Sequence, residues 1–232
     1  MGESGGVHRR LCSSRYEREA RQRGWQRIAG LDEVGRGALF GPVVAAAVIL
    51  NPKRRIAGLD DSKRLAPDRR SILAHRICEH ALGWSVATVD ASRIDAWNIY
   101  QASRQAMVEA VARLPVAPDY LLIDAVRLDL PIEQKSLIRG DARSVSIAAA
   151  SILAKVERDR LMQEFDRAFP EYGLGHNKGY ATPDHMEALR RFGPTPFHRF
   201  SFAPVRDALC WAVEATQAAL LDVPEAVQPG AE

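Results

Sequence analysis

The sequence is poor in cysteine, and the few cysteines that it has are scattered. Cys12, Cys78 and Cys210 lie far apart in a chain of 232 residues, so no pair has the spacing of a metal or redox site. Their odd number argues against a disulfide framework, and we expect reduced thiols. The six histidines show no metal-ligand spacing either, and of these only His198 merits a test. Disulfide scaffolds and cysteine–histidine metal sites are therefore excluded.

Long apolar runs are also missing. The longest one, residues 38–50, contains Gly41 and Pro42 and is shorter than the roughly 20 residues that a membrane-spanning helix needs. The N-terminus carries arginines and lacks the apolar segment of a secretory signal. We therefore expect a soluble, cytoplasmic protein that does not contact a membrane.

Net charge is small, because 32 Lys and Arg residues stand against 29 Asp and Glu residues, for a formal charge of +3. This excess permits a polyanionic partner without demonstrating one. The hydrophobic fraction of 47% and the charged fraction of 26% are those of an ordinary globular protein. Disordered and collagen-like classes are excluded, and the length suits one large domain.

Strand and helix patterns intermix along the chain and predict an α/β fold with a mixed sheet. We expect strands at residues 27–34, 43–50, 84–89, 120–123 and 136–139. We expect helices at residues 67–82, 94–114 and 146–169, one beginning at Thr182, and one at 203–221. The predicted division is a flexible basic arm at 1–19, one domain at 20–209 whose C-terminal helical part begins near 170, and a terminal helix end and tail at 210–232.

Seven arginines lie between residues 9 and 27, against only two glutamates. This segment is interpreted either as a solvated helix with charge pairs four residues apart or as a basic arm that contacts phosphate. The sequence leaves both interpretations open.

Four carboxylates lie in apolar segments of the sequence, where burial of a charged group costs free energy. Asp32 and Glu33 interrupt an apolar strand, Asp124 ends another, and Asp141 follows a glycine beside an alanine-rich helix. A buried carboxylate that stays charged needs a cation, backbone donors or a metal. Oxygen ligands of this kind suit Mg²⁺ or Mn²⁺. The alternative for each acid is that it caps a helix or binds an arginine.

Three further motifs are typical of contacts with a sugar–phosphate chain. Gly35, Arg36 and Gly37 directly follow the acid pair, and their glycines allow close approach of another backbone. Ser62 and Lys63 lie in a polar turn and are candidate phosphate contacts, or part of an ordinary capping turn. Lys178 and Tyr180 place a cation and an aromatic ring beside a glycine, although they also suit a surface loop with a tyrosine packed on the core. Together with the acids, these motifs predict a divalent-metal phosphoryl-transfer enzyme that acts on nucleic acid.

The same motifs closely resemble those of bacterial ribonuclease HII, in the expected order over roughly residues 20–209. The blocks are IAGLDEVGRG (28–37), GPVVAAAVIL (41–50), DSKRL (61–65), LLIDA (121–125), GD (140–141), residues 147–155, ERD (157–159) and HNKGY (176–180). The resemblance implies an RNase H-like fold, with a mixed central sheet flanked by helices and a C-terminal helical extension.

The resemblance also implies an activity and a set of roles. The enzyme would hydrolyse RNA in RNA/DNA hybrids and incise duplex DNA on the 5′ side of a single embedded ribonucleotide, leaving 3′-hydroxyl and 5′-phosphate ends. Two Mn²⁺ or Mg²⁺ ions would be held by Asp32, Glu33, Asp124 and Asp141, with Asp32 bridging both ions. The backbone of residues 35–37 would read the 2′-hydroxyl, and Tyr180 would pack on the following deoxyribose.

Two positions depart from the family pattern. Phe200 stands where a second arginine is usual, which puts one phosphate contact in doubt but not the chemistry. Ala66 precedes the helix at Pro67 where a Ser or Thr cap is common, at a cost of about 1 kcal/mol. Related type III enzymes carry an added N-terminal domain, and the 31 residues before Asp32 are too few to hold it, so we expect a type II enzyme.

Other functions and partners stay open at this point. A non-catalytic module of the same fold that grips hybrids, and a metal-dependent nuclease specific for DNA junctions, are the alternatives. Residues 217–221 loosely resemble a peptide that makes a weak contact with a sliding clamp, although they equally suit the apolar face of a last helix.

Overall fold

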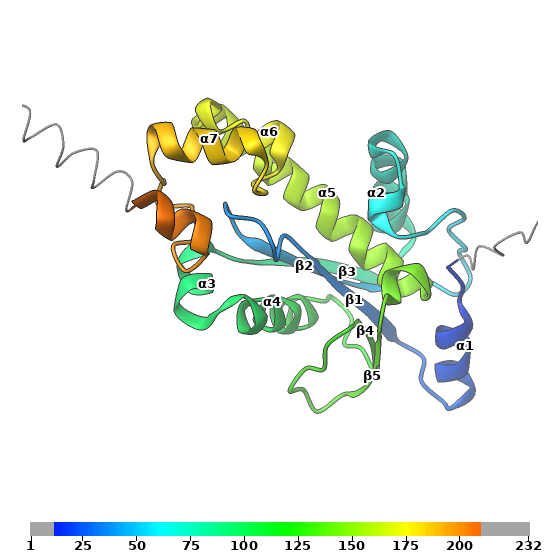
Figure 1. Cartoon of the computed structure of the whole chain (residues 1–232). Helices are drawn as coiled ribbons and strands as arrows, with labels where there is room; N and C mark the ends of the chain where they lie inside the picture. Colours follow the sequence, from blue (N-terminus) through cyan, green and yellow to red (C-terminus); the bar gives the residue numbers. More distant parts are fainter. Residues whose placement is uncertain (1–11, 210–232) are drawn as a thin grey trace, which may run out of the picture.

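The computed structural model describes residues 12–209 and contains a five-stranded mixed sheet between two layers of helices (Figure 1). The strands are β1 (Ile28–Val34), β2 (Val43–Ile49), β3 (Gly83–Val89), β4 (Tyr120–Asp124) and β5 (Glu133–Leu137). Their order across the sheet is β3-β2-β1-β4-β5. β1 pairs antiparallel with β2 and parallel with β4, β2 pairs antiparallel with β3, and β4 pairs parallel with β5.

The helices cover both faces of the sheet. They are α1 (Arg15–Gln22), α2 (Pro67–His80), α3 (Ala91–Trp97), α4 (Ile99–Ala112), α5 (Val145–Ala168), α6 (Leu174–Asn177) and α7 (Pro183–Phe192). Three short 3₁₀ turns are η1 (Ser62–Arg64), η2 (Gly140–Ala142) and η3 (Pro170–Tyr172). None of the helices between residues 12 and 209 is long and apolar enough to cross a lipid bilayer.

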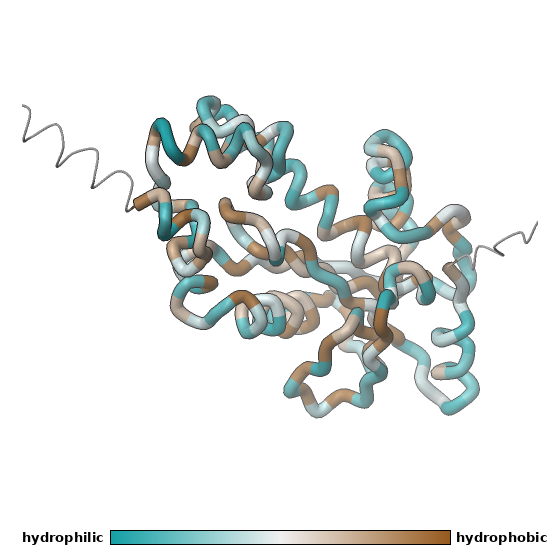
Figure 2. The backbone as a smooth tube through the Cα atoms, viewed as in Figure 1, coloured by the Kyte–Doolittle hydropathy of each residue, from teal (hydrophilic) through white to brown (hydrophobic). Residues whose placement is uncertain are grey.

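β2 explains the two-layered core, because every one of its side chains is buried. Val43 and Ala45 face the layer formed by α4, whereas Val44 and Ala46 face α2 and α5. A continuous apolar, β-branched run is therefore what a strand buried on both faces requires. In Figure 2 the central strands carry much of the apolar colour, while α1 is mainly hydrophilic.

The helix predicted over residues 94–114 is wrong as a single helix. The chain forms α3 and α4, which are separated at Asn98, where φ is 75°. The Asn98 side chain accepts a hydrogen bond from the Gln101 amide at 3.1 Å and so caps α4. Left-handed backbone at one residue re-aims the chain while the apolar spacing on either side continues.

Two predicted boundaries also move. The strand expected at residues 136–139 is β5, Glu133–Leu137, and it ends before Arg139, where φ is 55°. The boundary between a flexible arm and the domain at residue 19 falls inside α1, because that helix is packed on the domain through buried Glu17 and Ala20. The last predicted helix is present over 203–209, and its continuation to 221 lies outside the described residues.

Candidate active site

The four carboxylates come from neighbouring segments of the sheet. Asp32 and Glu33 lie near the end of β1, and Asp124 is the last residue of β4. Because these strands run parallel with Leu31 paired to Ile123, Asp32 and Asp124 follow at equivalent positions. Asp141 lies in η2, directly after β5 and before α5. The topology thus brings together acids that lie up to 109 residues apart in the sequence.

All four acids line one cavity of about 330 Å³. Its other predicted lining residues are Gly35, Arg36, Gly37, Lys63 and Tyr180. A neighbouring hollow of about 380 Å³ shares Lys63, Asp124 and Asp141 and adds Asp61. Asp61 was not predicted as a site residue, although it directly precedes the Ser62-Lys63 pair.

Two predicted substrate contacts lie outside this cavity. The Ser62 hydroxyl is buried and accepts a hydrogen bond from the Ser151 hydroxyl at 2.7 Å, so it joins η1 to α5. The Lys178 ammonium donates to the carbonyl of Gly175. Both side chains therefore stabilise the surroundings of the cavity and do not line it.

The acids lie in surroundings that oppose their ionisation. Burial and then the carboxylates of Glu33, Asp124 and Asp141 hold the pKa of Asp32 well above its usual range. Burial also raises the pKa of the other three acids, against opposition from the Arg36 guanidinium at Glu33 and from the Gly140 amide at Asp124. The Asp124–Gly140 hydrogen bond is 2.6 Å long. Negative charge in the cavity is therefore only partly compensated by the chain itself.

The donor set fits a divalent cation. Glu33 Oε2 is buried and has no hydrogen-bond partner among the described residues, while Arg36 lies 3.3 Å from Oε1. Four carboxylates without any histidine or cysteine are the oxygen ligands that Mg²⁺ and Mn²⁺ prefer. Over residues 12–209 no three such side chains are already gathered around one point. The four acids line the cavity without surrounding one common point.

Two buried arginines hold the loop that follows the acid pair. Arg199, which is 0% exposed, donates to the carbonyls of Arg36 at 2.9 Å and Gly41 at 3.0 Å. Arg158, which is 1% exposed, donates to the carbonyls of Phe40 and Lys178, both at 3.1 Å. Burial, followed by the charge of Arg158, lowers the pKa of Arg199 to about 9. Over residues 12–209 neither guanidinium forms an ion pair with a carboxylate. Backbone carbonyls accept hydrogen bonds from both, while Arg158 Nε and Arg199 Nη2 are buried without a partner among these residues.

The Arg158 side chain packs directly against the backbone of Gly35. Its φ is 89°, and a Cβ at this position would lie 2.6 Å from the Arg158 side chain. Neither arginine was predicted to have this role. The available signal for Arg158 was its position on the apolar face of α5, four residues from both Ala154 and Met162, which are fully buried. Phe200, at the position of the missing arginine, is 37% exposed on the surface, and its amide donates to Asp95.

Two histidines position the backbone carbonyl of Tyr180 through a chain of hydrogen bonds. Its carbonyl lies 2.9 Å from His185 Nδ1, which must carry the proton because a carbonyl only accepts. His185 Nε2 is then an acceptor, and His198 Nε2 donates to it across 3.2 Å. The amide of Thr195 donates to His198 Nδ1 at 2.9 Å, which fixes the same tautomer independently. His198, the one histidine singled out in the sequence, therefore helps to position the backbone of Tyr180.

Comparisons with known proteins agree with this geometry. The ribonuclease HII family model matches residues 29–205. The chain is 60% identical over 195 residues to ribonuclease HII of Solibacter usitatus, covering 84% of this chain and 86% of the relative. It is 57% identical over 214 residues to ribonuclease HII of Koribacter versatilis, covering 92% and 82%.

Solved structures show the same fold. The ribonuclease H2 of Pyrococcus horikoshii aligns with a TM-score of 0.69 at 25% identity, covering 79% of this chain and 97% of that one. A Bst-RNase HIII in complex with Mn²⁺ aligns with a TM-score of 0.63 at 26% identity, covering 84% and 73%. The predicted RNase H-like fold is thereby confirmed. The chain belongs to the ribonuclease HII family, the metal-dependent endonucleases of the type 2 ribonuclease H class.

Proposed function

We propose that this enzyme hydrolyses the RNA strand of RNA/DNA hybrids and incises duplex DNA on the 5′ side of a single embedded ribonucleotide, leaving 3′-hydroxyl and 5′-phosphate ends. The observation that carries the proposal is that the loop of residues 35–37 and Tyr180 share one cavity with the four carboxylates. Since the 2′-hydroxyl distinguishes RNA from DNA, a backbone loop beside the acids is suited to reading it. We place this activity in the cytoplasm.

We propose that Asp32, Glu33, Asp124 and Asp141 hold two Mn²⁺ or Mg²⁺ ions. When bound, such ions lower the pKa of water and stabilise negative charge on a leaving oxygen. Asp32 is assigned to contact both ions, because it is buried and lines the same cavity as the other three carboxylates. The chain contributes the fixed backbone positions of these acids at strand ends and in η2.

The loop of residues 35–37 is assigned to reading the 2′-hydroxyl through its main chain. A Cβ at Gly37 would meet no atom within 4 Å, so the space beside this residue is open to a sugar. Arg199 fixes the carbonyl of Arg36, which orients the following peptide without using a side chain in the cavity. A rigid backbone reader of this kind loses little entropy when it binds.

Tyr180 is assigned to packing on the deoxyribose that follows the ribonucleotide. Tyr180 is 37% exposed and lines the cavity, while its carbonyl accepts a hydrogen bond from His185. Lys63 and Arg36 are assigned to phosphate, because they are the two cationic side chains that line the cavity. Ser62 and Lys178 are assigned to holding the walls, as their hydrogen bonds support.

The proposal is tested on a DNA duplex containing one ribonucleotide, with Mn²⁺ or Mg²⁺ added. We expect a nick on the 5′ side of the ribonucleotide, with none in an all-DNA duplex and none with the Asp32→Asn variant. Binding without a nick would indicate a non-catalytic module. Cleavage of an all-DNA junction would indicate a DNA-junction nuclease.

The role of Tyr180 is tested with Tyr180→Ala and Tyr180→Phe. We expect the alanine variant to lower single-ribonucleotide incision about tenfold or more, because it removes the ring proposed to pack on the deoxyribose; a tenfold change corresponds to about 1.4 kcal/mol. The phenylalanine variant keeps the ring and should retain most activity. Metal affinity should stay unchanged in both, and unaltered incision in Tyr180→Ala would refute this role.

A sliding-clamp contact is a further part of the proposal. A solved relative is the RNase HII of Archaeoglobus fulgidus in a complex with PCNA, which aligns with a TM-score of 0.66 at 26% identity over 76% of this chain and 95% of that one. The segment predicted to make a weak clamp contact here, residues 217–221, lies outside the described residues. Removing residues 217–232 and measuring clamp binding would test it.

A further inference from the structure

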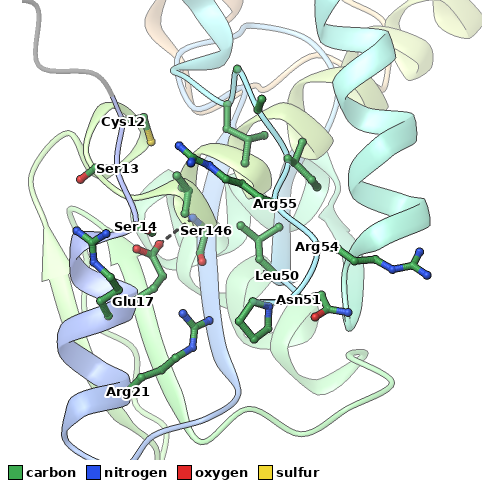
Figure 3. A pocket seen from close by; sticks show the side chains of 17 residues that line it. Cys12, Ser13, Ser14, Glu17, Arg21, Leu50, Asn51, Arg54, Arg55 and Ser146 are labelled. Atoms are coloured by element: carbon green, nitrogen blue, oxygen red, sulfur yellow. Dashed lines mark hydrogen bonds between the residues drawn. The ribbon is translucent and has the colours of Figure 1, made fainter.

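A second cavity, of about 470 Å³, lies between α1, the loop that follows β2, and the first turn of α5 (Figure 3). It shares no lining residue with the catalytic cavity. The nuclease activity leaves this cavity without a role.

Four arginines line this second cavity. Arg18 and Arg21 come from α1, whereas Arg54 and Arg55 come from the loop after β2. The Arg54 guanidinium lies 3.3 Å from His80 Nδ1 and points away from Arg21 and Arg55 (Figure 3), so Arg18, Arg21 and Arg55 are the candidates for binding phosphate. Over residues 12–209 the side chains of Arg18, Arg21 and Arg55 have no hydrogen bond or ion pair, and Arg21 Nε is buried without a partner. By contrast, Arg15 on the same helix pairs with Glu19 at 2.7 Å. Unpaired guanidinium groups gathered around one cavity are suited to binding phosphate.

Glu17 supplies an acceptor inside the same cavity. Its side chain is 2% exposed, and Oε1 accepts hydrogen bonds from the Ser144 hydroxyl at 2.6 Å and the Ser146 amide at 2.9 Å. Oε2 is buried and has no partner among the residues that the structure describes. A buried acceptor without a donor is costly, so this oxygen is available to an N–H group of a ligand.

The remaining wall is apolar. Leu50, Ile56, Leu59 and Val145 line the cavity beside the arginines and Glu17. Ile56 and Leu59 are buried and form part of the core cluster of α2 and α5. This wall offers a flat ring an apolar surface to pack against.

We propose that this cavity binds a nucleoside phosphate, with the phosphate on the arginines, the base against the apolar wall, and a base N–H group donating to Glu17 Oε2. Each part of such a ligand has a matching group on the cavity lining, whereas inorganic phosphate would use only the arginines. The volume lies within the range of about 300–1,000 Å³ that is usual for small-ligand sites.

The test is titration calorimetry of the full chain with ADP, GDP and pyrophosphate in the presence of EDTA. Chelation prevents binding to the acid cavity through a metal, so the outcome is independent of the proposed nuclease mechanism. We expect both nucleotides to bind more tightly than pyrophosphate. The double variant Arg21→Ala/Arg55→Ala should weaken nucleotide binding about tenfold or more, and the matched control Arg15→Ala should leave it unchanged.

Glu17→Gln tests the base contact separately. Glutamine retains an oxygen for Ser144 and Ser146 but replaces the free acceptor with a donor, so nucleotide affinity should fall about tenfold. Pyrophosphate affinity should not fall, because the substitution removes a negative charge from the cavity that holds the arginines. Circular dichroism would verify that this variant is folded. Equal affinity for ADP and pyrophosphate, or nucleotide binding that is insensitive to the arginine pair or to Glu17→Gln, would overturn the proposal.

Discussion

The two halves of α5 support the catalytic cavity in opposite ways. The first half packs against β1 through small residues, so closely that a Cβ on Gly30 would lie 2.1 Å from the carbonyl carbon of Ser146. Beside it lie acids whose pKa values are raised by burial. The second half carries Arg158, a buried cation whose guanidinium donates to backbone carbonyls.

The two halves therefore differ in how their buried charges are stabilised. Hydrogen bonds within the chain stabilise the buried arginine, whereas the buried carboxylates lack a comparable set of partners and are suited to binding a cation. The carbonyls of Phe40, Pro42 and Lys178 accept hydrogen bonds from the Arg158 guanidinium. Among the described residues the four carboxylates receive only Arg36 and single backbone amides. Substitutions in the two regions should therefore have opposite effects on stability. Neutralising an acid should stabilise the fold and abolish activity, while removing the arginine should destabilise the fold.

Asp32→Asn should give the largest effect. We expect incision to fall about 10³-fold or more, because the substitution removes the carboxylate assigned to both ions. The free energy of unfolding without added metal should rise at neutral pH, since a buried and repelled charge is removed. Urea denaturation measures the second effect, with Asp129→Asn in an exposed loop as control. A lower free energy of unfolding in Asp32→Asn would contradict the expectation that the Asp32 carboxylate destabilises the fold in the absence of metal.

Arg158→Met should lower the free energy of unfolding by about 3 kcal/mol or more, because it leaves buried carbonyls without donors. Arg158→Lys keeps the charge but cannot reach as many carbonyls, so it should lie in between. The control is Arg160→Met, two residues along the same helix. Arg160 is exposed and pairs with Glu157 and Glu164, and its loss should cost under about 1 kcal/mol.

Addition of Mn²⁺ should stabilise the proteins that retain Asp32 and leave the Asp32→Asn variant unchanged. At a concentration about 100 times the dissociation constant, a ligand that binds only the folded state adds about 2.7 kcal/mol to its stability. We expect this gain for the unaltered chain and for Arg158→Lys, but not for Asp32→Asn. Equal thermal shifts in all three proteins would mean that the metal binds elsewhere.

The smallest expected effect comes from the histidines behind Tyr180. Burial, and then His185, lowers the pKa of His198 to about 3 from 6.5. Between these two values only the unfolded chain binds the proton, so stability falls as the pH drops through this window, by about 2 kcal/mol at pH 5. Unfolding measured from pH 7 to 5 should show a shallower dependence in His198→Asn. The exposed His75→Asn should retain the full slope.

Most of the fold could be predicted because its signals are local. A continuous apolar run indicated β2, and Thr182 with Pro183 indicated the start of α7, where the Thr182 hydroxyl accepts from the His185 amide. β5 was misplaced because residues 133–136 are polar, and its position depends on pairing with β4. The break at Asn98 interrupts a helix whose apolar spacing continues across it.

In the candidate site, too, residues with a local sequence signal could be predicted, whereas residues whose roles depend on distant contacts could not. The acids could be predicted because a carboxylate at the end of an apolar strand is unusual in the sequence itself. The roles of Arg158 and Arg199 depend on carbonyls more than 100 residues away, which no local pattern shows. Ser62 has a motif that suggested phosphate, but its hydroxyl is already used by Ser151 on α5.

The order of the strands also divides the four acids by local stability. β1 is the central strand of the five, whereas β4 lies beside the edge strand β5. In native-state hydrogen exchange, amides of a central strand exchange only through global unfolding, while an edge can open by itself. We therefore expect the backbone of Asp32 and Glu33, on β1, to exchange more slowly than the backbone next to β5. Asp124 pairs with Leu137 of β5 and Asp141 follows that strand, so we expect these two acids to lose their fixed backbone positions first when the edge of the sheet opens.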